Sequence, residues 1–183
     1  SKSVYQALGY KNKDRSKKTD IGILDNHCRC EVLINRYSID EFNSRFKFCI
    51  VRNPWERAVS WFYYHKNVIR SPVYNTTFKQ WVLNNCPHHW KKQNGTDYLQ
   101  LGLSPLEQWH WIYDQHDNIM VDFVAKYETL NEDFSKVLHK LYPLNPTLAD
   151  EICLKTVNSY SRNRKIDYMN EYDEITFNIV KEL

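Results

Sequence analysis

The chain has 183 residues, of which 42% are hydrophobic, and it carries a formal net charge of +3 at pH 7. A chain of this length and composition buries one sizeable core, so we expect a single domain over residues 1–183. The absence of any run of 18 apolar residues and the odd number of cysteines argue against a membrane-spanning helix and a disulfide scaffold. The segments HCRC at residues 27–30 and CPHH at residues 86–89 do not have the usual spacing of zinc ligands, so no metal site is predicted.

The amino-terminal residues 1–9, SKSVYQALG, are predicted to form a short helix that ends at Gly9. Because small hydroxyl residues occupy its first turn, the positive end of this helix is open to an anion. A basic segment at residues 11–18 follows. We expect this segment to be either a solvated loop or a surface that collects an anionic substrate.

The next predicted strand is the apolar run at residues 21–24, which leads into a loop that contains His27. A histidine at a strand end suits general-base catalysis because its pKa lies close to neutral pH. A structural or exposed histidine is the alternative, and in that case Glu31 is the substitute candidate for the base.

The central stretch, FKFCIVRNPWERAVSWFYYH at residues 46–65, predicts a strand, a tight turn and a helix. Residues 46–51 are an apolar, β-branched and aromatic run that is typical of a buried parallel strand. Asn53 is the predicted N-cap, and Pro54 begins a helix that continues to about residue 67. The apolar residues of this helix recur at helical spacing, so one face can pack on the sheet.

Two polar residues of this stretch suit a phosphate group. Arg52 follows the strand at the carboxyl edge of the sheet, where open α/β sheets bind their ligands. Ser60 lies eight residues later, two turns along the helix, so a guanidinium and a hydroxyl are presented together. The alternative is an ordinary strand-end ion pair and a surface serine, and spacing alone does not decide between the two.

Caps and apolar periodicity predict the remaining elements. Ser38 and Glu41 have capping-box spacing at the start of a short helix over residues 38–45. Thr129 with Glu132 opens another helix in the same way. The predicted strand is residues 119–125, and the further helices are residues 77–83, 104–111, 129–142 and 173 to the end. Tryptophans and cations alternate between residues 68 and 112, which suits either a satellite cluster on the core or a cleft for sugar rings that bear carboxylates or sulfates.

The motif VRNPWERAVSWFYY, with the strand before it, resembles the 3′-phosphate-binding motif of sulfotransferases that use 3′-phosphoadenosine 5′-phosphosulfate (PAPS). The resemblance is strongest to the carbohydrate and membrane-associated branch, and it implies that Arg52 and Ser60 hold the 3′-phosphate of the nucleotide. The phrase VDFVAKYETLNEDF at residues 121–134 resembles the same family. It implies that Tyr127 approaches the nucleotide, the alternative being a tyrosine that anchors the following helix.

The same resemblance assigns roles near both ends of the chain. The first three residues resemble the end of the 5′-phosphosulfate loop, and we expect the strand and the first part of that loop to precede them; an ordinary capped helix is the alternative. The family places its general base between the two phosphate motifs, which assigns this role to His27. A late basic loop closes over the nucleotide in similar enzymes, although a solvated basic turn is an equal alternative here. The residues assigned to the nucleotide at the two ends are Ser1, Lys2, Ser3, Arg162, Arg164 and Lys165.

These inferences describe one α/β domain with a central parallel sheet flanked by helices, in the P-loop-like sulfotransferase fold. The resemblance implies transfer of a sulfonate group from PAPS to a hydroxyl of a carbohydrate acceptor, with adenosine 3′,5′-bisphosphate as the product. It implies no nucleic-acid partner, and membrane association only through a segment upstream of Ser1. The compartment would be the Golgi lumen for a eukaryotic protein and the cytoplasm for a bacterial one. Two alternatives stay open: a nucleotide-dependent kinase of similar fold, and a non-catalytic module that binds anionic glycans.

Overall fold

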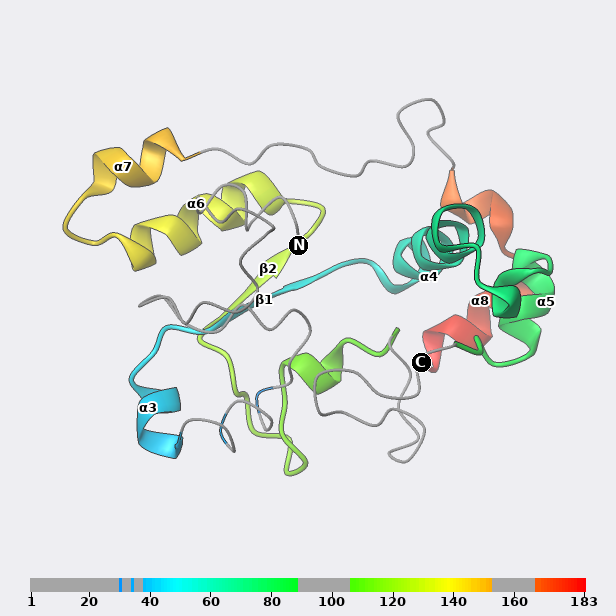
Figure 1. Cartoon of the computed structure of the whole chain (residues 1–183), viewed down its shortest axis with the longest axis horizontal. Helices are drawn as coiled ribbons and strands as arrows, with labels where there is room; N and C mark the ends of the chain where they lie inside the picture. The colour runs from blue at the N-terminus through cyan, green and yellow to red at the C-terminus, as the bar shows by residue number, and fades with distance from the viewer. Residues whose placement is uncertain (1–29, 31–33, 35–37, 89–105, 153–166) are drawn as a thin grey trace. The chain divides into compact units, whose positions relative to one another are not determined.

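The computed structural model describes residues 30, 34, 38–88, 106–152 and 167–183, which form two compact units (Figure 1). Unit 1 takes the described residues up to Ile50 and from His110 to Ile152. Unit 2 takes the described residues from Val51 to His88, from Leu106 to Trp109 and from Asp167 to Leu183. The prediction of a single domain over residues 1–183 stays a prediction. The predicted helix at residues 1–9, the strand at residues 21–24 and the basic loop at residues 158–165 lie outside the described residues.

A two-stranded parallel sheet organises unit 1. It pairs β1 (Phe48–Val51) with β2 (Phe123–Lys126), and the backbone N–H groups of Asp122 and Phe123 both donate to the carbonyl of Lys47. In Figure 1 the two strands run side by side, with α6 (Leu130–Leu141) next to β2 and α7 (Pro146–Glu151) beside α6. The α/β class and the two strongest predicted strands are therefore confirmed, and β2 is shifted toward the carboxyl end of its predicted range.

The core of unit 1 lies between the sheet and its helices. Phe134, Val137 and Leu138 of α6 are buried together with Ala149 of α7. Side chains of both strands pack against this cluster, among them Phe48, Ile50 and Phe123. The apolar positions of α6 recur every three to four residues, so its buried face is the one that the sequence pattern predicts.

The start of α6 differs from the predicted capping box. Thr129 makes no cap hydrogen bond; its hydroxyl instead donates to Asp133 Oδ2 at 3.0 Å. Asp133 Oδ2 also accepts the backbone N–H of Lys126 at 2.9 Å, and Lys136 Nζ donates to Oδ1 at 2.8 Å. The backbone hydrogen bond from Lys126, followed by the bond from Lys136, lowers the pKa of Asp133 to about 2. Asp133 therefore ties the end of β2 to the first turn of α6, and the predicted cap from the Thr129 side chain is not formed.

Two other predicted segments take shorter forms. The helix α3 (Ile39–Asn43) begins after Ser38, whose side chain accepts the N–H of Glu41 as predicted. Within the range predicted as a helix at residues 104–111, the described residues contain only a single 3₁₀ turn, Trp109–Trp111, labelled η3.

Helices make up unit 2. The helix α4 (Pro54–Tyr64) continues directly as the π-helix η1 (His65–Ile69), followed by the 3₁₀ turn η2 (Pro72–Tyr74) and by α5 (Phe78–Leu83). The last described segment adds the 3₁₀ turn η4 (Tyr168–Glu171) and α8 (Glu174–Lys181). Figure 1 shows α4, α5 and α8 gathered together. Among the described residues, no helix is both long and apolar enough to cross a bilayer.

The buried face of α4 packs against other helices. Its residues Ala58, Val59 and Phe62 join one cluster with Trp81 of α5 and Val180 of α8. Aromatic rings of the neighbouring helices account for this packing within unit 2, since Phe62 contacts the rings of Tyr74, Phe78 and Trp81 at centroid distances of 5.4 to 5.9 Å. The predicted packing of α4 on the sheet stays a prediction.

Polar caps and an ion pair fix the helix ends of unit 2. Thr77 accepts the N–H of Gln80 at the start of α5, and Asp173 forms a capping box with Thr176 at the start of α8. Lys79 Nζ lies 2.6 Å from Asp173 Oδ2 and so joins the two helices. The hydrogen bond from Lys79, followed by the one from Thr176, holds the pKa of Asp173 well below its usual range.

Candidate functional site

The turn between β1 and α4 has the geometry that its sequence predicts. Asn53 accepts the backbone N–H of Glu56 through Oδ1 at 3.1 Å, and its own carbonyl accepts the N–H of Arg57 at 2.8 Å. Pro54 occupies the first helical position, where its missing N–H costs no hydrogen bond. The chain therefore passes from strand to helix within two residues, and Arg52 stands at the start of this turn.

A side-chain amide fixes the backbone of Arg52 from a distant part of the sequence. Arg52 N–H donates to Gln108 Oε1 at 2.7 Å, and Gln108 Nε2 donates back to the carbonyl of Arg52 at 2.6 Å. One glutamine thus satisfies both backbone polar groups of Arg52, as a neighbouring strand would. Gln108 is the residue of this turn that the sequence analysis missed, since nothing in the local sequence marks a glutamine 56 positions away as a partner of Arg52.

The side chain of Arg52 forms an ion pair on the surface of the helix. Its Nη2 lies 2.6 Å from Glu56 Oε1, with 22% and 33% of the two side chains exposed. This is the ion pair that the alternative interpretation of Arg52 expects. It is also compatible with anion binding, because a phosphate oxygen and a carboxylate oxygen use the same guanidinium donors.

Ser60 lies on α4 one helical turn after Glu56, the ion-pair partner of Arg52. The spacing of four residues places Glu56 and Ser60 on one face of the helix, whereas Arg52 precedes the helix and reaches Glu56 from the turn. Ser60 is exposed, and in the part of the chain that the structure describes its hydroxyl makes no hydrogen bond. The first turns of α4 therefore offer a guanidinium at Glu56 and an open hydroxyl one turn further on.

The remaining predicted site residues divide into one described residue and several that are not described. Tyr127 follows β2 directly, as predicted, and has 47% of its side chain exposed. The assigned residues that lie outside the described part are His27, Ser1, Lys2, Ser3, Arg162, Arg164 and Lys165.

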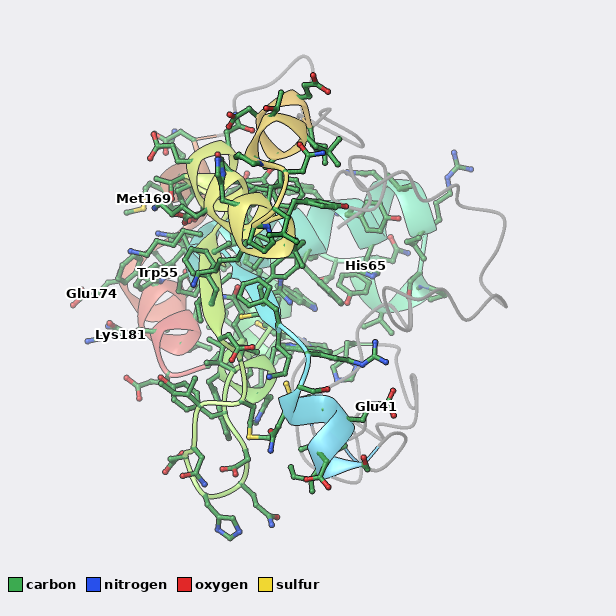
Figure 2. The ribbon with its side chains drawn as sticks, turned by 90° about the vertical axis from the view of Figure 1, so that its left-hand side faces the viewer. Glu41, Trp55, His65, Met169, Glu174 and Lys181 are labelled. Carbon is green, nitrogen blue, oxygen red and sulfur yellow. The ribbon has the colours of Figure 1, made fainter. Side chains whose placement is uncertain are left out.

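One other histidine near the motif has a structural environment. His65 at the end of α4 is 4% exposed, and its Nδ1 lies 2.9 Å from the carbonyl oxygen of Trp61 (Figure 2). Its ring stacks on Trp61 and Tyr74 at centroid distances of 4.3 and 5.0 Å. A histidine packed in this way belongs to the core of unit 2, and we do not assign it to proton transfer.

Comparison with known proteins identifies the family. The sequence model of the sulfotransferase family matches residues 10–151, a span that includes the turn, α4 and the β2 segment. The chain belongs to the sulfotransferase family. The prediction of a PAPS-dependent sulfotransferase family is thereby confirmed, and the kinase and glycan-binding alternatives are not favoured.

Two relatives of this sulfotransferase chain have measurable sequence identity. An uncharacterized protein of Archaeoglobus fulgidus is 27% identical over 118 residues, which cover 58% of this chain and 76% of the archaeal protein. Carbohydrate sulfotransferase 11 of Danio rerio is 33% identical over 131 residues, which cover 57% of this chain and 36% of that protein. The chain thus spans about a third of the length of the zebrafish sulfotransferase. No solved structure gives a significant match.

Proposed function

We propose that this sulfotransferase chain moves a sulfonate group from PAPS to a hydroxyl group of a carbohydrate. The observation that supports the proposal is the ion pair of Arg52 with Glu56 at the start of α4, one helical turn before the exposed Ser60, in a chain that matches the family over most of its length. The carbohydrate acceptor is supported by the 33% identity with carbohydrate sulfotransferase 11.

In this proposal, Arg52 and Ser60 bind the 3′-phosphate of the nucleotide. The guanidinium supplies a charged, forked donor and the serine a neutral one, and together they distinguish a 3′-phosphorylated adenosine from one that lacks this group. Gln108 acts as a positioning residue, because its two hydrogen bonds fix the backbone from which the Arg52 side chain extends. Binding of the phosphate would recruit guanidinium donors that Glu56 now shares.

The transfer itself would use groups near the amino terminus. The acceptor oxygen attacks sulfur while the bond from sulfur to the 5′-phosphate oxygen breaks, and His27 takes the proton of the acceptor hydroxyl. The backbone N–H groups of Ser1, Lys2 and Ser3 would stabilise the charge on the departing phosphate, which leaves as adenosine 3′,5′-bisphosphate. Tyr127, Arg162, Arg164 and Lys165 would contact the nucleotide. As in phosphoryl transfer, catalysis of this kind comes mainly from positioning and charge stabilisation.

A transfer assay tests the proposal. The protein is incubated with PAPS that carries ³⁵S and with a panel of neutral and acidic oligosaccharides, and the labelled products are separated from the nucleotide. The proposal expects label on at least one oligosaccharide and none when ATP labelled on its γ-phosphate replaces PAPS. Transfer of phosphate from ATP, or binding of PAPS without transfer to any carbohydrate, would overturn it.

A further inference from the structure

A pocket with polar lining lies in unit 2, past the carboxyl end of α4. It has a volume of about 310 Å³ and is formed where the π-helix η1 ends and the chain reverses into η2. The residues that line it are Lys66, Arg70, Ser71, Pro72, Tyr74 and Asn75. None of them is part of the site proposed for the nucleotide.

The backbone places an arginine where this reversal would normally favour glycine. Arg70 has φ 56° and ψ 39°, the left-handed conformation, and its N–H closes the last turn of η1 on the carbonyl of His65. Glycine is the usual residue at such a helix end because it has no Cβ to crowd the carbonyl. Residues held in this conformation are enriched at functional sites. The left-handed backbone at Arg70 thus fixes the point from which its side chain extends beside the pocket.

Among the residues that the structure describes, no acidic side chain balances the positive charges of the pocket. Lys66 Nζ donates to the carbonyl of Thr76 and lies 5.3 Å from the ring centroid of Phe62, so neutral groups hold it in place. Arg70 is exposed, and within the described ranges its guanidinium makes neither a hydrogen bond nor an ion pair. Lys79, also in unit 2, provides the contrast because it is paired with Asp173.

The sequence around the pocket also contains more basic than acidic residues. No aspartate or glutamate occurs between Glu56 and Asp97, whereas this stretch contains several lysines and arginines. Ser71 and Asn75 add a hydroxyl and an amide at the pocket wall. Two cations with neutral donors beside them form a recognition set for an oxyanion such as a carboxylate or a sulfate.

The size and location of the pocket limit which ligands can bind in it. Its volume is at the lower end of the range of small-molecule sites, about 300–1,000 Å³, so it suits one acidic group together with the ring that bears it. The 11 residues of α4 alone span about 16 Å, so one phosphate group cannot contact both Arg52 and this pocket. The ligand of the pocket is thus separate from the 3′-phosphate.

We infer that this pocket binds an acidic sugar of the acceptor polysaccharide at a point removed from the transfer centre. This inference rests on the proposed function, because it specifies that the carbohydrate acceptor is an acidic one. The shared chemistry is an oxyanion on a sugar ring, and either a uronic-acid carboxylate or a sulfate ester supplies it. Binding at this second point orients a long chain and increases the affinity for polymers over single sugars.

The test measures binding of defined oligosaccharides by calorimetry at low ionic strength. The probes are hyaluronan oligosaccharides, which carry only carboxylates, the same oligosaccharides with their carboxylates reduced to alcohols, heparin oligosaccharides, and inorganic sulfate. Protein is produced in a bacterial host, because Asn75 begins an Asn-Thr-Thr sequon and an attached glycan would cover the pocket.

The key variant is Arg70→Gly, which removes the guanidinium and at the same time relaxes the left-handed backbone, so it should fold at least as well as the wild type. The matched control is Lys181→Gln, which removes one charge from an exposed residue of unit 2 that points into solvent (Figure 2). We expect the Arg70→Gly variant to bind the acidic oligosaccharide about tenfold more weakly, the loss typical of one charge-assisted hydrogen bond, and the control to bind as the wild type does.

The different probes and variants distinguish failure of the pocket from failure of the proposed function. Preference for hyaluronan over heparin identifies the carboxylate as the ligand, and the reverse identifies the sulfate. Equal binding by the Arg70→Gly variant and the wild type overturns the inference, and so does binding of inorganic sulfate alone. Where hyaluronan is the ligand, equal binding of its reduced and carboxylate forms overturns it as well. Stabilisation by adenosine 3′,5′-bisphosphate is measured in parallel: if the nucleotide fails to bind while the acidic sugar binds at Arg70, the proposed function fails and the pocket stands.

Discussion

The two hydrogen bonds between Gln108 and the backbone of Arg52 give the sharpest test of how the site is built. Replacing Gln108 with alanine removes both bonds, at 2.7 and 2.6 Å, and leaves a partly buried N–H and carbonyl without their partner. A hydrogen bond contributes about 0.5–1.5 kcal/mol net, and an unsatisfied buried group costs about 1–3 kcal/mol. Because Arg52 is part-exposed and water can replace some of the loss, we expect a destabilisation of about 2 kcal/mol.

The assay for this prediction is urea unfolding, with Gln80→Ala as the matched control. Gln80 also uses its amide in a hydrogen bond, to Asn84 at 3.2 Å, but on the exposed surface of α5. Surface substitutions of this kind change the free energy of unfolding by about 0.5 kcal/mol or less. For a chain of this size, 2 kcal/mol lowers the melting temperature by roughly 4–8 °C. If the Gln108→Ala variant unfolds like the control, the amide does not hold the turn and the reasoning is refuted.

The remaining predictions concern the proposed base and the acid stability of unit 1. Replacing His27 with alanine should abolish sulfonate transfer from PAPS but leave nucleotide affinity nearly unchanged; retained turnover would mean that another residue is the base. The pKa of Asp133 is lowered to about 2, so the stability that it contributes is present above its unfolded pKa and is lost as the pH falls from about 4 to 2. An Asp133→Asn variant should lose this part of the acid dependence in a series of unfolding curves, and a slope equal to that of the wild type would show that its hydrogen bonds do not stabilise the native state.

Local signals predicted the elements around the site correctly. Asn53, Pro54, Ser38 and Thr77 all act at the helix starts where the sequence places them, because a cap depends on residues within one turn of the chain. The buried face of α4 follows its apolar spacing for the same reason. The ion pair of Arg52 with Glu56 is a local property too, since the two residues are four positions apart in one turn and the start of one helix.

Contacts between distant residues could not be predicted in this way. The pairing of Arg52 with Gln108 spans 56 positions, and nothing in the composition around Gln108 distinguishes it from the neighbouring polar residues. At the start of α6, the spacing of Thr129 and Glu132 predicted a capping box, but Asp133 competes for the Thr129 hydroxyl and also bonds to Lys126 in β2. The competing partner comes from tertiary structure, which a pattern of four residues does not contain.

The π-helix at the end of α4 is a further feature that the sequence pattern did not predict. The apolar spacing predicted a helix to about residue 67, and the chain does stay helical to Ile69, but with the wider π geometry from His65 onward. The buried stack of His65 between Trp61 and Tyr74 accompanies this change. The left-handed Arg70 and the pocket beside it follow from that geometry, so neither is visible in the sequence.

The central claim is that Arg52 recognises a 3′-phosphate, and the most direct measurement compares two nucleotides on two variants. Calorimetry gives the affinities of adenosine 3′,5′-bisphosphate and adenosine 5′-monophosphate for the wild type, for Arg52→Met, and for Arg45→Met. Arg45 is the control because it forms an equivalent ion pair with Glu41 at 2.6 Å, outside the motif. We predict that the wild type and the control prefer the bisphosphate by about tenfold or more, the value of one charge-assisted interaction, and that Arg52→Met removes most of this preference. Equal affinities of the wild type for the two nucleotides, or an unchanged preference in Arg52→Met, would contradict the claim.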